Sequence, residues 1–305
     1  MKRIRNVARQ PHVAPSSIYS RRIGIILLAL LLIAAVSNGA SKGSALDLGS
    51  LEPQELKEQL GNWTLLDARP GKDWERGHIP GALLFSWEDH IQGNGSEGAY
   101  RLPEPEKLAL ELGRMGISES SPVVVYGDAD RSWGGEGWAV WVLSWLGHKG
   151  PVRLLDGGIQ SWRQRGYPLA SGAIREQPAG RHYTTDVRGE LNIEAVQLGD
   201  RAGHLAVIDT RSTFEWLTGR LPNAVHIPWT EFFEGKERRP IDGMALSRLL
   251  REHGVDPDKP VVFYCTAGVR SAYAWMVHTL ASSRTARNYG GGMSDWEAYS
   301  GRKAS

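Results

Sequence analysis

Residues 261–271, Val-Val-Phe-Tyr-Cys-Thr-Ala-Gly-Val-Arg-Ser, place the only cysteine of the chain a few residues before a glycine and an arginine. The apolar, β-branched run before Cys265 predicts a buried strand, the segment from Cys265 to Arg270 a tight loop, and the stretch from Ser271 onward a helix. Such a loop directs backbone N–H groups and the positive end of the helix dipole toward one point. We therefore expect a thiol that ionises readily, because its charged form is the one stabilised.

This environment makes Cys265 a candidate nucleophile and gives its neighbours distinct roles. Gly268 allows a loop conformation that other residues resist, and Arg270 adds a permanent positive charge. Thr266 could donate a further hydrogen bond. The loop N–H groups predicted to bind the substrate and stabilise its negative charge are those of Thr266, Ala267, Gly268, Val269, Arg270 and Ser271. The alternative is that Cys265 is a small buried hydrophobic residue without chemistry.

The pattern Cys265-Thr-Ala-Gly-Val-Arg270-Ser271 resembles the active-site loop of the rhodanese family of sulfurtransferases. Phosphatases with a Cys-x5-Arg loop are the nearest alternative, but only four residues separate Cys265 from Arg270 here. The shorter loop forms a smaller cradle, which suits one sulfur atom better than a phosphate.

Length and composition indicate an ordinary globular protein. The chain has 305 residues, enough for two domains, with 41% hydrophobic and 23% charged residues. A single cysteine excludes an intramolecular disulfide, and no Cys/His cluster is present for zinc or an iron–sulfur centre. We therefore expect no metal and no other cofactor.

The positive charge of the chain is concentrated at its N-terminus. Residues 1–42 hold seven basic residues and no acidic one, which leaves 29 Lys and Arg against 34 Asp and Glu, a formal charge of −5, in the rest. This balance predicts no nucleic-acid partner for the folded part.

Residues 1–42 have the pattern of a signal peptide or an N-terminal membrane anchor. Residues 23–36 are fourteen residues without a polar side chain. As a helix they span about 21 Å, less than the roughly 30 Å of a bilayer core. Because the basic residues precede this run, we expect the rest of the chain to be exported, to the bacterial periplasm, or tethered to the inner membrane facing it. An organellar transit peptide fits less well because the run is not amphipathic.

An internal duplication organises the remaining sequence. Leu-Leu-Asp-Ala-Arg at 65–69 recurs as Val-Ile-Asp-Thr-Arg at 207–211, and Gly-His-Ile-Pro-Gly-Ala at 77–82 recurs as Gly-Arg-Leu-Pro-Asn-Ala at 219–224. The strand at 123–126 and the Gly-Gly-x-x-x-Trp block at 157–162 recur at 261–264 and 291–296. Apolar runs alternate with helical stretches such as 54–60, 105–115 and 244–252. This order predicts two α/β domains, each a parallel sheet flanked by helices.

The order of these blocks resembles the full rhodanese pattern in its tandem form. We expect a rhodanese-like domain at 45–170, a linker at 171–189 and a second rhodanese-like domain at 190–302. Gly127 stands where the second half has Cys265, so the N-terminal domain lacks the nucleophile. The resemblance implies that this inactive domain helps to form the cleft.

Several first-domain residues have two possible roles. Asp128, Asp130, Arg131 and Trp133 either line the cleft or form a solvated turn. Three tryptophans at helical spacing predict packing in the core or between domains. They are Trp138, Trp141 and Trp145.

Arg211 is either a structural ion-pair partner of Glu215 or another acid, or a residue that binds the substrate anion, as the resemblance implies. His226, in the His-Ile-Pro turn, is predicted to be a hydrogen-bonded structural residue. No His or acid is placed by the sequence as an obvious base beside Cys265, so we expect activation by the loop amides, the helix dipole and Arg270.

These residues predict a sulfurtransferase that moves a sulfane sulfur from thiosulfate to cyanide or a thiol through a Cys265 persulfide. The alternatives are a 3-mercaptopyruvate sulfurtransferase and a non-turnover persulfide carrier or binding module. Loops resembling Cys-Gly-Ser-Gly-Val-Thr are usual for mercaptopyruvate, and this loop departs from them. The expected partners are a small-molecule sulfur donor and acceptor, a protein sulfur acceptor being a further option, with a membrane only at the N-terminal segment.

Overall fold

The computed structural model describes residues 46–91, 100–129, 131–172, 179–201, 204–256, 258–282, 284 and 286–304. The predicted leader at 1–42 lies outside these residues. In the described part of the chain, no helix is long and apolar enough to cross a membrane.

Among the described residues, the first half forms a parallel five-stranded sheet in the order β1-β5-β4-β2-β3. Its strands are β1 (Leu48–Leu51), β2 (Thr64–Asp67), β3 (Leu83–Leu84), β4 (Val123–Tyr126) and β5 (Val152–Leu155). Its helices are α2 (Pro53–Glu58), η1 (Leu60–Asn62), α3 (Gly71–Arg76), η2 (Trp87–Asp89), α4 (Pro105–Arg114), α5 (Gly135–Trp145) and α6 (Gly158–Gln164). Successive β4 side chains enter different clusters, Val125 with α4 and α5, and Val124 with α2 and α6. Helices therefore cover both faces.

The second half repeats this arrangement with a four-stranded parallel sheet, β11-β10-β6-β7, in its described residues. The strands are β6 (Ala206–Asp209), β7 (Val225–His226), β10 (Val261–Tyr264) and β11 (Ala286–Tyr289), with a short antiparallel pair of β8 (Phe233–Glu234) and β9 (Arg239–Pro240). The helices are η3 (Gly189–Leu191), α7 (Ala195–Arg201), α8 (Thr213–Thr218), η4 (Trp229–Phe232), α9 (Gly243–Glu252), α10 (Val269–Ala281) and α11 (Gly292–Ala304). Because β10 occupies the position of β4, the predicted duplication of an α/β fold is confirmed.

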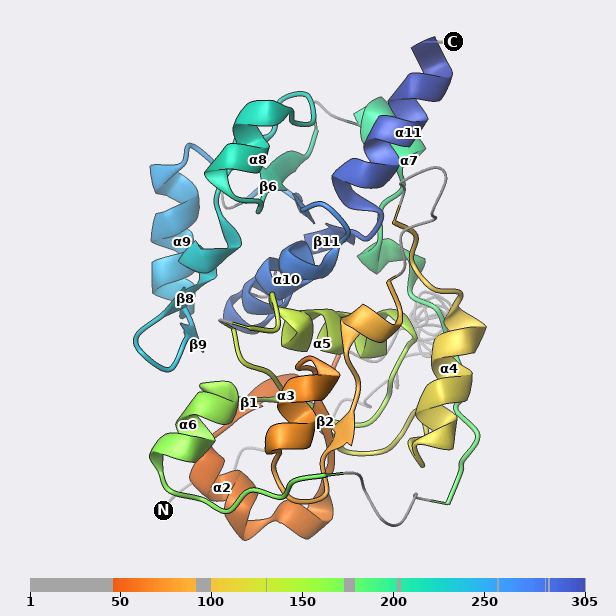
Figure 1. The fold of residues 1–305 in the computed structure, drawn as a ribbon. Coiled ribbons are helices and arrows are strands. Elements are labelled where there is room, and N and C mark those ends of the chain that lie inside the picture. Colours follow the sequence, from red (N-terminus) through yellow and green to blue (C-terminus); the bar gives the residue numbers. More distant parts are fainter. Residues whose placement is uncertain are drawn as a thin grey trace, which may run out of the picture. The chain divides into compact units, whose positions relative to one another are not determined.

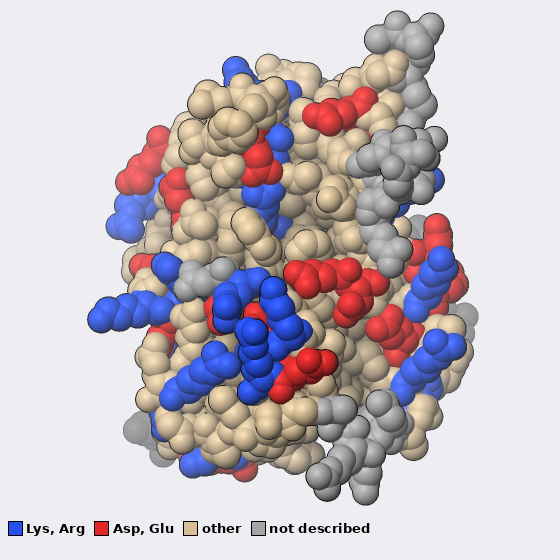
Figure 2. Space-filling model, in the orientation of Figure 1, with Lys and Arg blue, Asp and Glu red and all other residues tan. Residues whose placement is uncertain are grey.

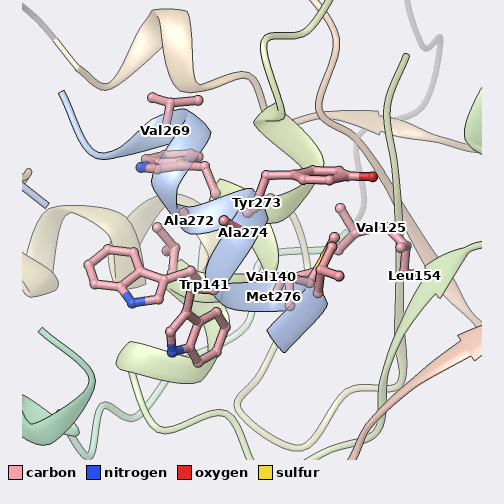
Figure 3. Close-up of a cluster of buried hydrophobic side chains, with 14 of the residues drawn as sticks. Val125, Val140, Trp141, Leu154, Val269, Ala272, Tyr273, Ala274 and Met276 are labelled. Atoms are coloured by element: carbon pink, nitrogen blue, oxygen red, sulfur yellow. The ribbon is translucent and has the colours of Figure 1, made fainter. Parts of the chain in front are cut away.

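Helices α5 and α10 join the two halves through one hydrophobic core (Figure 1). Val140 and Trp141 of α5 lie against Ala272, Tyr273 and Met276 of α10 (Figure 3). Helix α5 is buried along its whole length, because its own sheet covers one side and α10 covers another. The predicted packing role of the three tryptophans is confirmed, since Trp138, Trp141 and Trp145 are all buried.

The helix after Cys265 begins earlier than the sequence predicted. Val269 and Arg270 already belong to the first turn of α10, and Gly268 is its N-cap residue. The loop between β10 and α10 is therefore tighter than expected, which brings the N-terminus of α10 closer to the cysteine in sequence.

Candidate active site

Cys265 lies directly after β10, in the short loop that connects this strand to α10. Its side chain is 2% exposed. Gly268 has φ +80°, a left-handed conformation that favours glycine, and a Cβ there would collide with the backbone of Gly290. The carbonyl groups of Cys265 and Thr266 accept hydrogen bonds from the N–H groups of Met293 (2.7 Å) and Ser294 (3.2 Å). Two backbone hydrogen bonds from the start of α11 thus hold the loop in place.

A hydroxyl group that the sequence did not single out faces the sulfur. Ser271 Oγ lies 3.6 Å from Cys265 Sγ and donates to Asn288 Oδ1 at 2.7 Å. Asn288 Nδ2 in turn donates to the carbonyl of Gly268 at 3.0 Å. Ser271 was predicted to contribute its N–H, but its side chain also contributes. Asn288 is fully buried in β11 and therefore needs a hydrogen-bond partner, but this strand was not predicted from the sequence.

Arg270 does not act as an isolated positive charge, because it pairs with Glu215. Its Nη1 donates to Oε2 and its Nη2 to Oε1 of Glu215, both at 2.7 Å, and Nη2 also donates to Thr266 Oγ1 at 2.9 Å. Thr266 donates to Glu215 Oε1 at 2.7 Å. Glu215 is placed by the capping box of α8, in which the side chain of Ser212 accepts from the N–H of Glu215 and the carboxylate of Glu215 accepts from Ser212.

These contacts fix the charge of both partners. The hydrogen bonds from Arg270, which outweigh burial, hold the pKa of Glu215 well below its usual range. Burial opposes the charge of Arg270, but its hydrogen bonds to Glu215 and its attraction to Cys265 raise its pKa. Glu215 is thus an acid at the Cys265 pocket, but a carboxylate held this firmly in its ionised form is a poor base, so it does not supply the base that the sequence failed to indicate. The sequence feature that could have identified Glu215 is the acid–aromatic pair Glu215-Trp216, which follows the Val-Ile-Asp-Thr-Arg block at 207–211.

The sulfur lies at a pocket of about 340 Å³, a size suited to a small molecule. Its lining residues are Trp87, Tyr100, Trp133, Glu215, Cys265, Thr266, Ala267, Val269 and Arg270. Trp87, Tyr100 and Trp133 come from the first half of the chain. The N-terminal domain therefore contributes an aromatic wall to the pocket, as the resemblance implied. Among the described residues of its predicted loop set, Trp133 is the one that lines the pocket.

The other loop residues of the first domain do different things. Asp128 is buried and accepts from Gln160 at 2.9 Å, while the exposed Arg131 forms an ion pair with the buried Asp73 at 3.4 Å. Asp130 lies outside the described residues. Trp133 is 56% exposed and its ring centroid lies 5.9 Å from the guanidinium of Arg270.

Arg211 is absent from the residues that line this pocket. It is buried, donates to both carboxylate oxygens of Asp209 (2.7 to 3.1 Å) and donates to the carbonyl of Gly219 at 2.6 Å. Arg69 makes the same contacts with Asp67 and Gly77 in the inactive half. This repetition favours the structural interpretation of Arg211 over substrate binding, with Asp209 rather than Glu215 as its partner.

His226 also has the predicted structural contacts. Its Nε2 lies 2.9 Å from the carbonyl oxygen of Arg211, and its ring stacks on Trp216. Across the face drawn in Figure 2, basic side chains gather near the centre with acidic side chains directly beside them. That face therefore has mixed charge, in keeping with the balance calculated from the sequence.

Comparison with known proteins places these features in one family. The model of the Rhodanese-like domain matches residues 52–165 and, a second time, residues 193–299. The chain belongs to the rhodanese family, with two rhodanese-like domains in tandem.

Several relatives that align with most of this chain are named sulfurtransferases. A Pseudomonas aeruginosa protein named "Probable 3-mercaptopyruvate sulfurtransferase" is 31% identical over 241 residues, covering 73% of this chain and 82% of that protein. The Mycobacterium tuberculosis protein "Putative thiosulfate sulfurtransferase SseB" is 30% identical over 251 residues, covering 77% and 86%. The crystal structure of the 3-mercaptopyruvate enzyme SseA from Escherichia coli matches with a TM-score of 0.70 at 24% identity, covering 80% of this chain and 98% of that one, and has the same fold. The chain is a sulfurtransferase of this family.

Proposed function

We propose that the protein transfers the thiol sulfur of 3-mercaptopyruvate to a thiol or cyanide through a persulfide on Cys265. The observation that carries this proposal is the position of Cys265 in the lining of a small aromatic-walled pocket, just before the N-terminus of α10. The first-turn N–H groups of α10 have no acceptor within the helix, so they are available to an anion. A nucleophile, a pocket and anion-stabilising donors thus meet at one point.

The chemistry follows from this arrangement. The Cys265 thiolate attacks the sulfur of mercaptopyruvate, and a sulfur–sulfur bond forms while the carbon–sulfur bond breaks. The electron pair of the broken bond passes to carbon as the enolate of pyruvate, which takes a proton. A second thiolate, or cyanide, then attacks the outer sulfur and restores the Cys265 thiolate, giving a new persulfide or thiocyanate. The loop N–H groups stabilise the sulfur anion in both steps, and the Ser271 hydroxyl adds to them when its single hydrogen turns from Asn288 Oδ1 to Cys265 Sγ.

The charge of the pocket supports a carboxylate donor over thiosulfate, which the sequence had favoured. Thiosulfate carries two negative charges, and the guanidinium that lines the pocket is already neutralised by Glu215. Mercaptopyruvate carries one negative charge and an apolar methylene, which suits aromatic walls. The Pseudomonas aeruginosa relative carries the name of this activity.

Thiosulfate is the second candidate donor, for two reasons. The Mycobacterium tuberculosis relative is named for it. The loop also has Thr266, Ala267 and Arg270 where mercaptopyruvate loops usually have Gly, Ser and Thr. In that reaction Cys265 takes the outer sulfur and sulfite leaves with the bonding pair. We further propose that residues 1–42 export the protein, which fractionation of cells tests directly.

Intact mass spectrometry of the full chain tests these proposals. Each donor is added separately to the protein and to Cys265→Ser, and cyanide follows. A gain of one sulfur with mercaptopyruvate, absent in Cys265→Ser and removed by cyanide, is the expected result. A gain only with thiosulfate selects the second candidate, and loading without repeated turnover selects a carrier. No gain with either donor would refute the proposed function.

A further inference from the structure

The inactive domain carries a buried acid at the place where its nucleophile would have been. Gly127 corresponds to Cys265, and a Cβ built on Gly127 would overlap the carboxyl group of Glu136. Glu136 lies in the first turn of α5 and is 5% exposed. The cradle of the missing thiol is therefore filled by a carboxyl group that the sulfur chemistry does not use.

This carboxyl group holds the loop that reaches into the catalytic pocket. Ser132 Oγ lies 2.7 Å from Glu136 Oε2 and 2.7 Å from the carbonyl oxygen of Asp128, and it accepts from the N–H of Asp128 at 3.2 Å. The carbonyl of Ser132 accepts from the indole N–H of Trp87 at 2.9 Å. Trp133, the next residue, has φ +55°, a conformation that a bulky side chain rarely adopts unless its surroundings impose it. Ser132 thus connects Glu136 to two of the tryptophans that wall the pocket.

The distances around Ser132 indicate which form of Glu136 fits this arrangement. Its hydroxyl has one hydrogen but lies 2.7 Å from two oxygen atoms that can accept it. If Glu136 is a neutral acid, its own O–H can donate to Ser132 Oγ while the serine hydrogen goes to Asp128, and both contacts become hydrogen bonds. If Glu136 is ionised, one of the two close oxygen pairs has no hydrogen.

We propose that Glu136 is a positioning residue which, as a neutral acid and through Ser132, holds Trp133 in the wall of the Cys265 pocket. Ionisation of Glu136 then loosens Ser132 and Trp133 and opens the pocket. Glu136 thereby controls access to Cys265. Only its effect on donor binding rests on the proposed transfer of sulfur through that residue.

The surroundings of Glu136 make this change of charge accessible near neutral pH. Burial raises its pKa to about 7, with the Ser132 hydrogen bond opposing and the Asp128 and Asp67 carboxylates adding to the shift. Asp67 is itself ion-paired with Arg69. On the α10 side, Glu136 and Tyr273 interact, and the pKa of Tyr273 is raised well above its usual value by burial first and by this acid second.

The test uses the single cysteine of the chain as a reporter, whichever sulfur donor it takes. The rate of Cys265 alkylation by iodoacetamide is measured by mass spectrometry at pH 6 and pH 8 for the full-length protein and for Glu136→Gln. Glutamine keeps the size of Glu136 and stays neutral, and its amide N–H group donates to Ser132 Oγ in place of the acid O–H. Because ionisation of Cys265 itself affects both proteins alike, the ratio of the two rates isolates Glu136.

We expect equal rates at pH 6 and, at pH 8, alkylation up to about tenfold faster in the parent protein than in Glu136→Gln, the effect of one pKa unit of coupling. In a Trp133→Ala background this pH-dependent ratio should disappear, because the wall is already absent. With the donor that loads Cys265, the KM of the parent alone should rise over the same interval, with kcat less affected. A ratio that is the same at both pH values, or that survives Trp133→Ala, would overturn the inference. If no donor loads the parent protein, the proposed function fails. The alkylation rates still test the role of Glu136, because they need no sulfur donor.

Discussion

Arg270 and Glu215, 55 residues apart in the sequence, form a two-point ion pair at the edge of the Cys265 pocket, with both N–O distances 2.7 Å. The pair ties the first turn of α10 to α8, and Thr266 hydrogen-bonds to both partners. A two-point contact of this kind fixes direction as well as charge. The guanidinium that lines the pocket therefore belongs to an ion pair without net charge, and we expect this pairing to affect which sulfur donors the pocket favours.

Glu215→Gln should change donor preference. Removing the carboxylate exposes the Arg270 charge to the pocket, and a dianion gains more from it than a monoanion. We expect the ratio of kcat/KM for thiosulfate to that for mercaptopyruvate to rise by about tenfold, corresponding to roughly 1.4 kcal/mol of added attraction. The measurement is steady-state sulfur transfer to cyanide with each donor.

The matched control for this change is Glu215→Gln in an Arg270→Met background. Without the guanidinium there is no charge to unmask, so the donor ratio should not rise further. An equal rise in both backgrounds would mean that Glu215 acts through loop geometry rather than through the charge of Arg270.

Ser271→Ala should weaken both the site and the fold. The change removes the hydroxyl 3.6 Å from Cys265 Sγ and leaves the buried Asn288 Oδ1 without its donor. We expect kcat to fall by about tenfold and the free energy of unfolding by about 1 to 3 kcal/mol. Thr279→Ala, which removes a hydroxyl from the same helix away from the pocket, should change stability with little effect on kcat. Equal kcat losses in the two variants would argue against a role for the Ser271 hydroxyl.

Gly268→Ala should lower the free energy of unfolding more than the replacement of a left-handed glycine that has open space around it. Gly254 has φ +71° with open space around its Cβ position, so Gly254→Ala should cost only the backbone strain, about 1 kcal/mol of unfolding free energy. Gly268→Ala adds a collision with the Gly290 backbone, and we expect a loss larger by at least about 1 kcal/mol together with loss of persulfide formation. Urea unfolding and mass spectrometry measure the two effects. Similar losses in stability would show that the loop can move aside.

The sequence alone predicted those features that depend on residues close to one another in the chain. The identity of neighbouring residues was enough to predict the strand, loop and helix around Cys265. It also predicted the duplicated blocks and the absence of a thiol at Gly127. The early start of α10 was missed, because Val269 and Arg270 have no sign of their own for a helix and only the left-handed Gly268 marks its first turn.

Features that depend on distant partners could not be predicted in the same way. The charge state of the Arg270 site depends on Glu215 of α8, and the hydroxyl beside Cys265 depends on Asn288 of β11. The sequence left two roles open for Trp133, lining the cleft or forming a solvated turn. Its place in the wall of the Cys265 pocket follows from the packing of α5 against α10, which brings together residues 132 positions apart. Glu136 reads as an ordinary first-turn acid until tertiary packing buries it.

Two buried titratable residues should give the stability of the protein opposite pH dependences. Burial raises the pKa of Glu136 to about 7, above the ordinary value of 4.5, so the folded state holds more protons than the unfolded state between these values. Its contribution is complete below pH 4.5 and is lost as the pH rises through 7. Burial, followed by the charge of Arg284, lowers the pKa of His278 from 6.5 to about 4, and among the described residues its Nδ1 has no hydrogen-bond partner. Its contribution is complete above pH 6.5 and is lost as the pH falls toward 4.

Urea unfolding from pH 4 to 8 separates the two contributions. Moving the pKa of Glu136 from 4.5 to about 7, or that of His278 from 6.5 to about 4, changes the free energy of unfolding by roughly 3 kcal/mol at most. The stability of the parent relative to Glu136→Gln should fall as the pH rises from 4.5 to 7. Relative to His278→Gln it should instead rise between pH 4 and 6.5. If the first difference does not depend on pH, Glu136 is ionised throughout, and the neutral acid beside Ser132 is ruled out, whereas a flat second difference would mean that His278 is protonated without cost inside α10.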